Sequence, residues 1–93
     1  MVIVMMVVDF HLPGCRSLKE KRHRLMRIRD RFGKQSNVAI CESDYHDVHH
    51  QAQWSFVAVG FDRKKVDQTL TEIELFLENG LDALMTEREL HVL

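Results

Sequence analysis

Residues 11–22 of the chain read HLPGCRSLKEKR. Pro13 and Gly14 predict a turn. Ser17 followed three residues later by Glu20 is a capping box: the Ser hydroxyl accepts a backbone N–H of the first helical turn, and the Glu side chain reaches back. The stretch therefore predicts a turn that leads directly into a helix.

The segments on either side of this turn have opposite characters. Residues 2–12 are rich in Val, Ile, Met and Phe and are apolar on both faces for most of their length, which predicts a central strand. The helix is expected from Leu18 to about Phe32, with an apolar stripe made by Leu18, Leu25, Ile28 and Phe32.

The remaining chain predicts three further strands and a second helix. The strands are expected at residues 37–42, 52–60 and 83–93, and the helix at 63–78, capped by Asp62. The order strand, helix, strand, strand, helix, strand indicates an α+β, ferredoxin-like βαββαβ fold, with a four-stranded antiparallel sheet and two helices on one face. Right-handed crossovers place the first and third strands in the centre.

Length and composition fit one small domain covering residues 1–93. The apolar run at residues 1–8 ends at Asp9, far short of the roughly 20 residues of a transmembrane helix. Cys15 and Cys41 have no metal-ligand spacing. We expect a cytoplasmic protein without membrane contact. Because the second sheet face is also apolar, we expect a homodimer, or a partner, on that face.

Charge is segregated along the chain. Residues 16–34 hold nine of the thirteen Lys and Arg residues against two acidic residues, a net charge of +7, whereas the whole chain carries −1. Helical spacing places Arg24, Arg27, Arg31 and Lys34 on the outward side, with Arg16 and Lys19 at the helix start. Such a face suits phosphate groups, although a solvated helix face is the simpler interpretation.

The same stretch resembles the signature of the YlxP-like family, small bacterial proteins of unknown function. The match rests on residues 11–14 and 16–22 and continues loosely at 37–39 and 57–59 and at single positions such as Glu42 and Asp47. The resemblance implies a ferredoxin-like fold and a bacterial cytoplasmic protein. The family's genes often lie near those of translation and transcription factors, which implies work on RNA or the ribosome. It implies no catalytic residues.

Two further groups of residues are candidates for chemistry. His46, Asp47 and His50 lie in a polar connection and could ligate a metal or act in acid–base catalysis, but their spacing matches no established motif. Trp54 and Phe56 share one face of a strand, which suits either base stacking or core packing.

We therefore expect a non-enzymatic protein without a cofactor that binds RNA or the ribosome through Arg16, Lys19, Arg24, Arg27, Arg31 and Lys34. The alternatives are a dimeric protein-interaction module that uses the apolar sheet face, and a metal-dependent hydrolase at the Asp/His loop.

Overall fold

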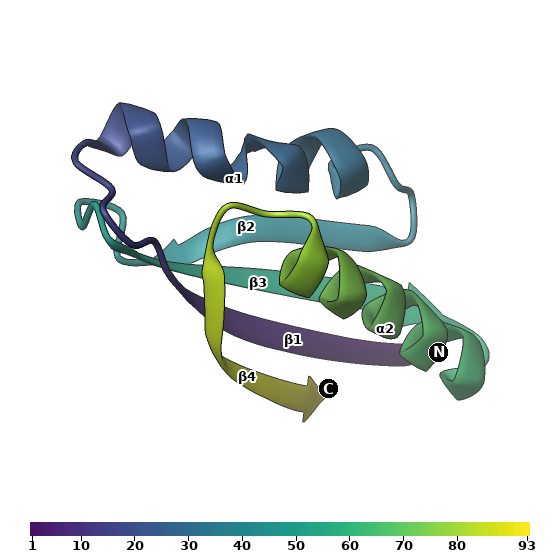
Figure 1. Cartoon of the computed structure of the whole chain (residues 1–93). Helices are drawn as coiled ribbons and strands as arrows, with labels where there is room; N and C mark the ends of the chain where they lie inside the picture. Colours follow the sequence, from purple (N-terminus) through teal and green to yellow (C-terminus); the bar gives the residue numbers. More distant parts are fainter.

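The structure, a computed structural model, describes residues 1–93 and contains the six expected elements (Figure 1). They are β1 (Val2–His11), α1 (Leu18–Phe32), β2 (Val38–Asp44), β3 (Gln51–Gly60), α2 (Arg63–Asn79) and β4 (Leu84–Val92). The order confirms the ferredoxin-like α+β fold. No helix has the length and apolarity needed to cross a membrane.

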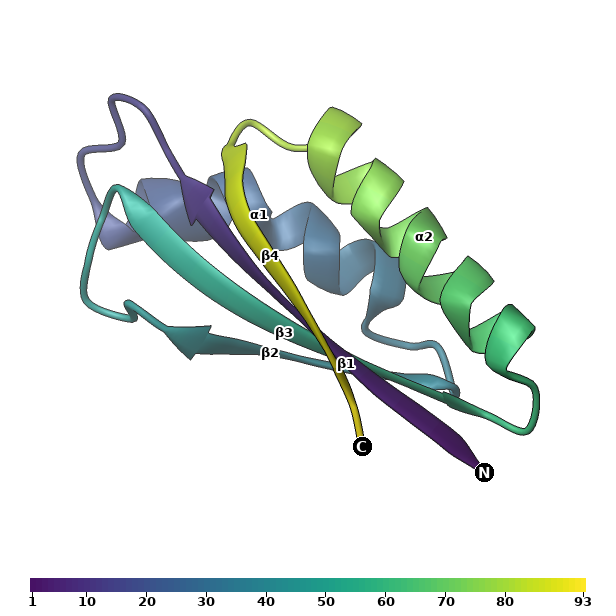
Figure 2. The ribbon, with the colours of Figure 1, turned by 90° about the horizontal axis from the view of Figure 1, so that it is seen from below.

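The four strands form one antiparallel sheet in the order β2-β3-β1-β4. β1 and β3 occupy the centre, as expected from right-handed crossovers, and they pair along their whole length, from Val2 opposite Gly60 to His11 opposite Gln51. Both helices lie on the same side of the sheet (Figure 1), and in the view from below α1 passes behind the strands while α2 runs alongside them (Figure 2). The opposite sheet face is left open.

The core lies between the sheet and the two helices. Alternate residues of β1 and β3 point towards the helices, as the two-residue period of a strand requires. From the helices, residues three or four positions apart complete the core. The buried apolar residues are Val4, Met6, Val8, Phe10, Leu12, Leu25, Ile28, Phe32, Ala52, Trp54, Phe56, Ala58, Val66, Leu70, Ile73 and Leu77.

Trp54 and Phe56 belong to this core, with 5% and 0% of their surface exposed. Both point to the helix side of β3, so the open sheet face has no aromatic platform from this strand. The suggestion that these two rings stack on RNA bases is therefore wrong. Alternation along the strand predicted that they share a face, but it did not say which face the helices cover.

The helix starts follow the sequence signals closely. Ser17 Oγ accepts a hydrogen bond from the backbone N–H of Glu20 at 3.0 Å. The second half of the capping box is absent, because the Glu20 carboxylate accepts from Arg24 at 2.6 Å instead. Gly14 has φ = 69°, a left-handed conformation that favours glycine, and it lets the chain turn before α1.

Candidate nucleic-acid interface

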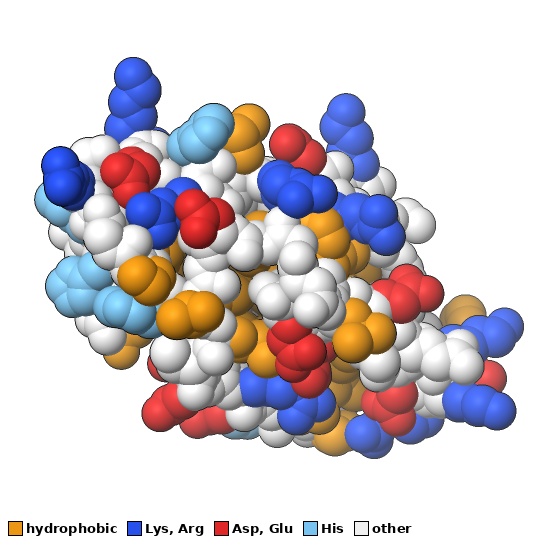
Figure 3. Space-filling view, viewed as in Figure 1, with side chains coloured by type: hydrophobic (Ala, Val, Ile, Leu, Met, Phe, Trp, Pro, Cys, Tyr) orange, Lys and Arg blue, Asp and Glu red, His pale blue; other side chains and the backbone are white.

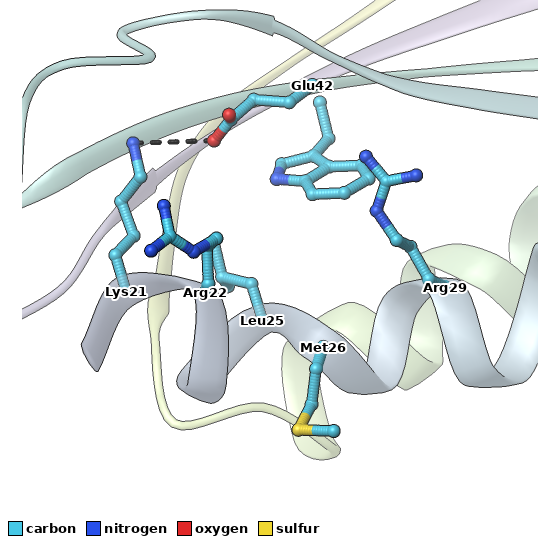
Figure 4. A pocket seen from close by; sticks show the side chains of 7 residues that line it. Lys21, Arg22, Leu25, Met26, Arg29 and Glu42 are labelled. Atoms are coloured by element: carbon cyan, nitrogen blue, oxygen red, sulfur yellow. Dashed lines mark ion pairs between the residues drawn. The ribbon is translucent and has the colours of Figure 1, made fainter. Parts of the chain in front are cut away.

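The ammonium group of Lys21 is buried inside the protein, with 2% of the residue exposed. Its Nζ donates to the backbone carbonyls of Tyr45, Val48 and Gln51 at 2.8, 2.9 and 3.0 Å. It also lies 3.3 Å from a carboxylate oxygen of Glu42 (Figure 4). The three protons of the ammonium thus have partners, and the carboxylate balances the charge.

This lysine organises the connection between β2 and β3. The carbonyl oxygens of residues 45, 48 and 51 turn towards it, and Tyr45 adopts a left-handed backbone conformation, φ = 61°. The connection is also tied to the turn before α1, because Leu12 N–H donates to the carbonyl of His50 at 2.9 Å. The polar character of the connection therefore has a structural reason: it wraps a buried cation.

The three weak metal-site candidates, His46, Asp47 and His50, lie exposed in this connection. His46 Nε2 is 3.0 Å from the backbone carbonyl of Glu42. No three His, Cys, Asp or Glu side chains of the protein come together in a way that could hold a metal ion. The metal-dependent hydrolase alternative thus gains no support from the geometry.

Basic side chains gather over α1, along the top of the molecule in Figure 3. Nine Lys and Arg residues lie between residues 16 and 34, and seven of them are exposed. Of the residues predicted to bind an anion, Arg16 and Lys19 lie exposed at the start of the helix, and Lys34 lies exposed just beyond its end. The exposed set consists of Arg16, Lys19, Arg22, Arg27, Arg29, Arg31 and Lys34; we call it the basic face.

Arg24 does not belong to this face, and its expected outward position is wrong. Its side chain is 16% exposed. The guanidinium donates to the carbonyl of Pro13 at 2.8 Å and to Glu20 at 2.6 Å, and lies 3.5 Å from Asp82. Arg24 thus connects the helix to the preceding turn and to the segment before β4. Helical spacing predicted an outward side chain, but the partners in the preceding turn and in the segment before β4 cover it.

Arg27 and Arg31 are exposed but are held in position by the second helix. Arg27 donates to the carbonyl of Gly80 at 2.7 Å, and its guanidinium lies 5.4 Å from the centre of the Phe76 ring. Arg31 lies 5.7 Å from the same ring and 5.9 Å from that of Phe32. Because a guanidinium has five N–H donors, both side chains keep donors that can face a partner.

The candidates chosen from the sequence did not include Arg22 and Arg29. Helical spacing places both beside the apolar stripe of α1. Both are exposed on the flank of α1 that faces β2 and β3, and Arg29 lies 5.2 Å from the centre of the Trp54 ring. Their exposure follows from the edge position of β2, beyond which no further strand covers the helix.

The open sheet face is divided into an apolar half and a polar half. Its apolar half consists of Ile3, Met5, Val7, Val57 and Val59, which are half-buried although no other element covers them. Further along β1 the same face becomes acidic: Asp9, Glu87 and Glu89 lie together around one small depression.

Fold and surface together define a small ferredoxin-like protein with a basic helical face and an uncovered sheet. The chain belongs to the family described as "Protein of unknown function (DUF503)", which matches residues 3–90. A search of curated proteins gave no match.

Proposed function

We propose that this protein binds RNA, on the ribosome or free, through the basic face of α1. The observation that carries the proposal is the seven exposed Lys and Arg residues on or beside one helix of a chain whose net charge is −1. Solubility does not require this segregation, whereas a phosphate backbone is attracted to it over many contacts. The resemblance of residues 11–22 to YlxP-like bacterial proteins supports a cytoplasmic RNA partner.

The charge distribution also supports an orientation for the complex. The acidic residues Asp9, Glu87 and Glu89 lie on the open sheet face, away from the helices. Phosphate groups would be repelled there and attracted to α1. The basic face contains five Arg residues, whose planar donor groups match phosphate oxygens in pairs. The proposed activity is binding without a catalytic step.

The direct test uses a variant in which Arg16, Lys19, Arg31 and Lys34 are all changed to Gln. The control changes Arg63, Lys64 and Lys65, exposed at the start of α2, to Gln, and so removes three positive charges where the first variant removes four. We expect the first variant to lose binding to fluorescently labelled ribosomal RNA hairpins, and to lose co-sedimentation with ribosomes, while the control keeps both. Equal loss in both variants, or no loss in the first, would contradict the proposal.

A second candidate function is assembly through the open sheet face, and it does not exclude RNA binding. Five apolar side chains on two central strands remain without a covering element, and uncovered apolar surface of this kind marks interfaces. We propose that a second copy of the chain covers it, apolar half against apolar half.

Sedimentation analysis of the double variant Met5→Gln/Val57→Gln tests the dimer. These polar side chains fit a solvent-exposed strand face, and circular dichroism checks that the variant folds. We expect a dimer for the natural protein and a monomer for the variant. A natural protein that sediments as a monomer at high micromolar concentration would refute this candidate.

A further inference from the structure

A pocket of about 220 Å³ opens between α1 and the edge of the sheet. Figure 4 shows Arg22 and Arg29 rising from the helix towards the strands, with the pocket between them. Leu25, Met26 and Trp54 provide its apolar wall. The Lys21–Glu42 ion pair completes the lining, and its two charges cancel.

The indole of Trp54 supplies the observation that points to a ligand. Trp54 is 5% exposed, and its Nε1 is buried without any hydrogen-bond partner. It is the one buried side-chain polar atom of the protein in this state. A buried donor without an acceptor is rare and destabilising, and an indole N–H can only donate. An acceptor entering the pocket would satisfy it.

The charge of the pocket favours an anion as that acceptor. Neither Arg22 nor Arg29 forms an ion pair with a carboxylate of the protein, although Arg24 on the same helix does. With Lys21 balanced by Glu42, the two arginines leave the pocket with a charge of about +2. Two guanidinium groups and one N–H donor are the groups that bind a carboxylate or a phosphate.

Access to the indole depends on the side chains at the pocket entrance. Arg22, Met26 and Arg29 are exposed, long and unbranched, so they can change rotamer without moving the core. The pocket is smaller than the roughly 300 Å³ at which pockets for drug-sized ligands begin. Its occupant is therefore a small anion or one anionic group of a larger molecule.

We propose that this pocket is an oxyanion site, in which one phosphate or carboxylate group lies between Arg22 and Arg29 and accepts a hydrogen bond from Trp54 Nε1. The site can be occupied whether or not the protein binds RNA, because a free metabolite can carry the same phosphate group as a nucleic-acid backbone. The apolar wall suits a ligand with a short hydrocarbon part next to its anionic group.

The single tryptophan of the chain makes the test specific, because ¹⁵N-labelled protein gives one indole N–H resonance. We would titrate the full chain with inorganic phosphate and with isobutyrate, keeping the ionic strength constant with chloride. We expect a saturable shift of the indole resonance with at least one of the two anions. Saturation with phosphate alone, or with isobutyrate alone, identifies the group that the site prefers.

The variant Arg22→Gln/Arg29→Gln should weaken the apparent affinity by about tenfold or more, because two charged hydrogen-bond donors are lost. The control Arg63→Gln/Lys64→Gln should leave the titration unchanged. The proposal is overturned if neither anion gives a saturable shift, or if the shift persists equally in the Arg22/Arg29 variant. RNA binding is measured separately with the Arg16/Lys19/Arg31/Lys34 variant, so either proposal can fail alone.

Discussion

At the scale of single residues, Lys21 is the side chain on which the local structure depends most. Its ammonium group donates to two carbonyls of the β2–β3 connection and one at the start of β3, and pairs with one carboxylate, while the residue is almost fully buried. Replacing it leaves these acceptors without a donor inside the protein, and the loss of one partner of a buried ionic group is costly.

We therefore expect Lys21→Met to lower the free energy of unfolding by about 3 kcal/mol, measured by urea denaturation. The control is Lys19→Met, two positions away and exposed on the same helix, with an expected change within about 0.5 kcal/mol. Amide exchange should also become faster at residues 45–51. Equal stability of the two variants would show that the buried ammonium contributes little.

Arg24 and Arg31 lie on one helix but have different roles, as Lys21 and Lys19 do: Arg24 is largely covered by partners in the protein, and Arg31 is exposed. Arg24 donates to the turn and to Glu20, whereas the exposed Arg31 rests on Phe32 and Phe76. Arg24→Gln should lower the free energy of unfolding by about 1–2 kcal/mol without weakening RNA binding. Arg31→Gln should weaken RNA binding a few-fold with little effect on stability. Paired denaturation and RNA anisotropy measurements separate the two roles, and a reversed pattern would contradict the assignment.

At the scale of the elements, the start of α1 is set by its cap. Ser17 Oγ is the acceptor for the Glu20 N–H, and replacing such a cap by alanine costs about 1 kcal/mol. We expect this loss for Ser17→Ala in thermal or chemical unfolding. Ser36→Ala, in the exposed turn after the helix, should change stability far less. Similar losses at both positions would mean that the cap does not determine the helix start.

The sequence predicts these elements well because their signals are local. α1 begins and ends at the expected residues, Leu18 and Phe32. The Ser17 cap precedes its first residue, an apolar stripe runs along it, and Gly33 follows its last residue. β2 extends to Asp44, beyond the expected end at Glu42, because its pairing with β3 continues after a register shift. The local sequence pattern does not predict this shift. The antiparallel order with β1 and β3 in the centre follows from chain connectivity.

The site is less predictable because its contacts are distant and involve the backbone. The Lys21 ammonium donates to backbone carbonyls 24 to 30 residues further along the chain. Because every residue has a backbone carbonyl, the pattern of side chains does not show which carbonyls will accept these hydrogen bonds. The Arg24 side chain is covered by contacts with Pro13, which precedes α1, and with Asp82, which lies far along the chain before β4. The predicted basic helix is confirmed as an element, but which of its arginines are free is decided by tertiary partners.

At the scale of the whole molecule, the two faces of the protein have different physical characters. The helical side carries the basic face, and the sheet side is apolar at one end and acidic at the other. A dimer formed through the sheet would place two copies of α1 on the outside. Two linked basic faces would raise the avidity for a long RNA without any new contact.

The salt dependence of RNA binding shows whether the protein binds phosphates through the basic face. For electrostatic binding, the logarithm of the affinity falls linearly with the logarithm of the salt concentration, and each phosphate contact contributes about 0.7 to 0.9 to the slope. We predict a steep slope for the natural protein and a slope smaller by about 3 when Arg16, Lys19, Arg31 and Lys34 are changed to Gln. A flat dependence, or an identical slope in this variant, would contradict RNA binding through the basic face.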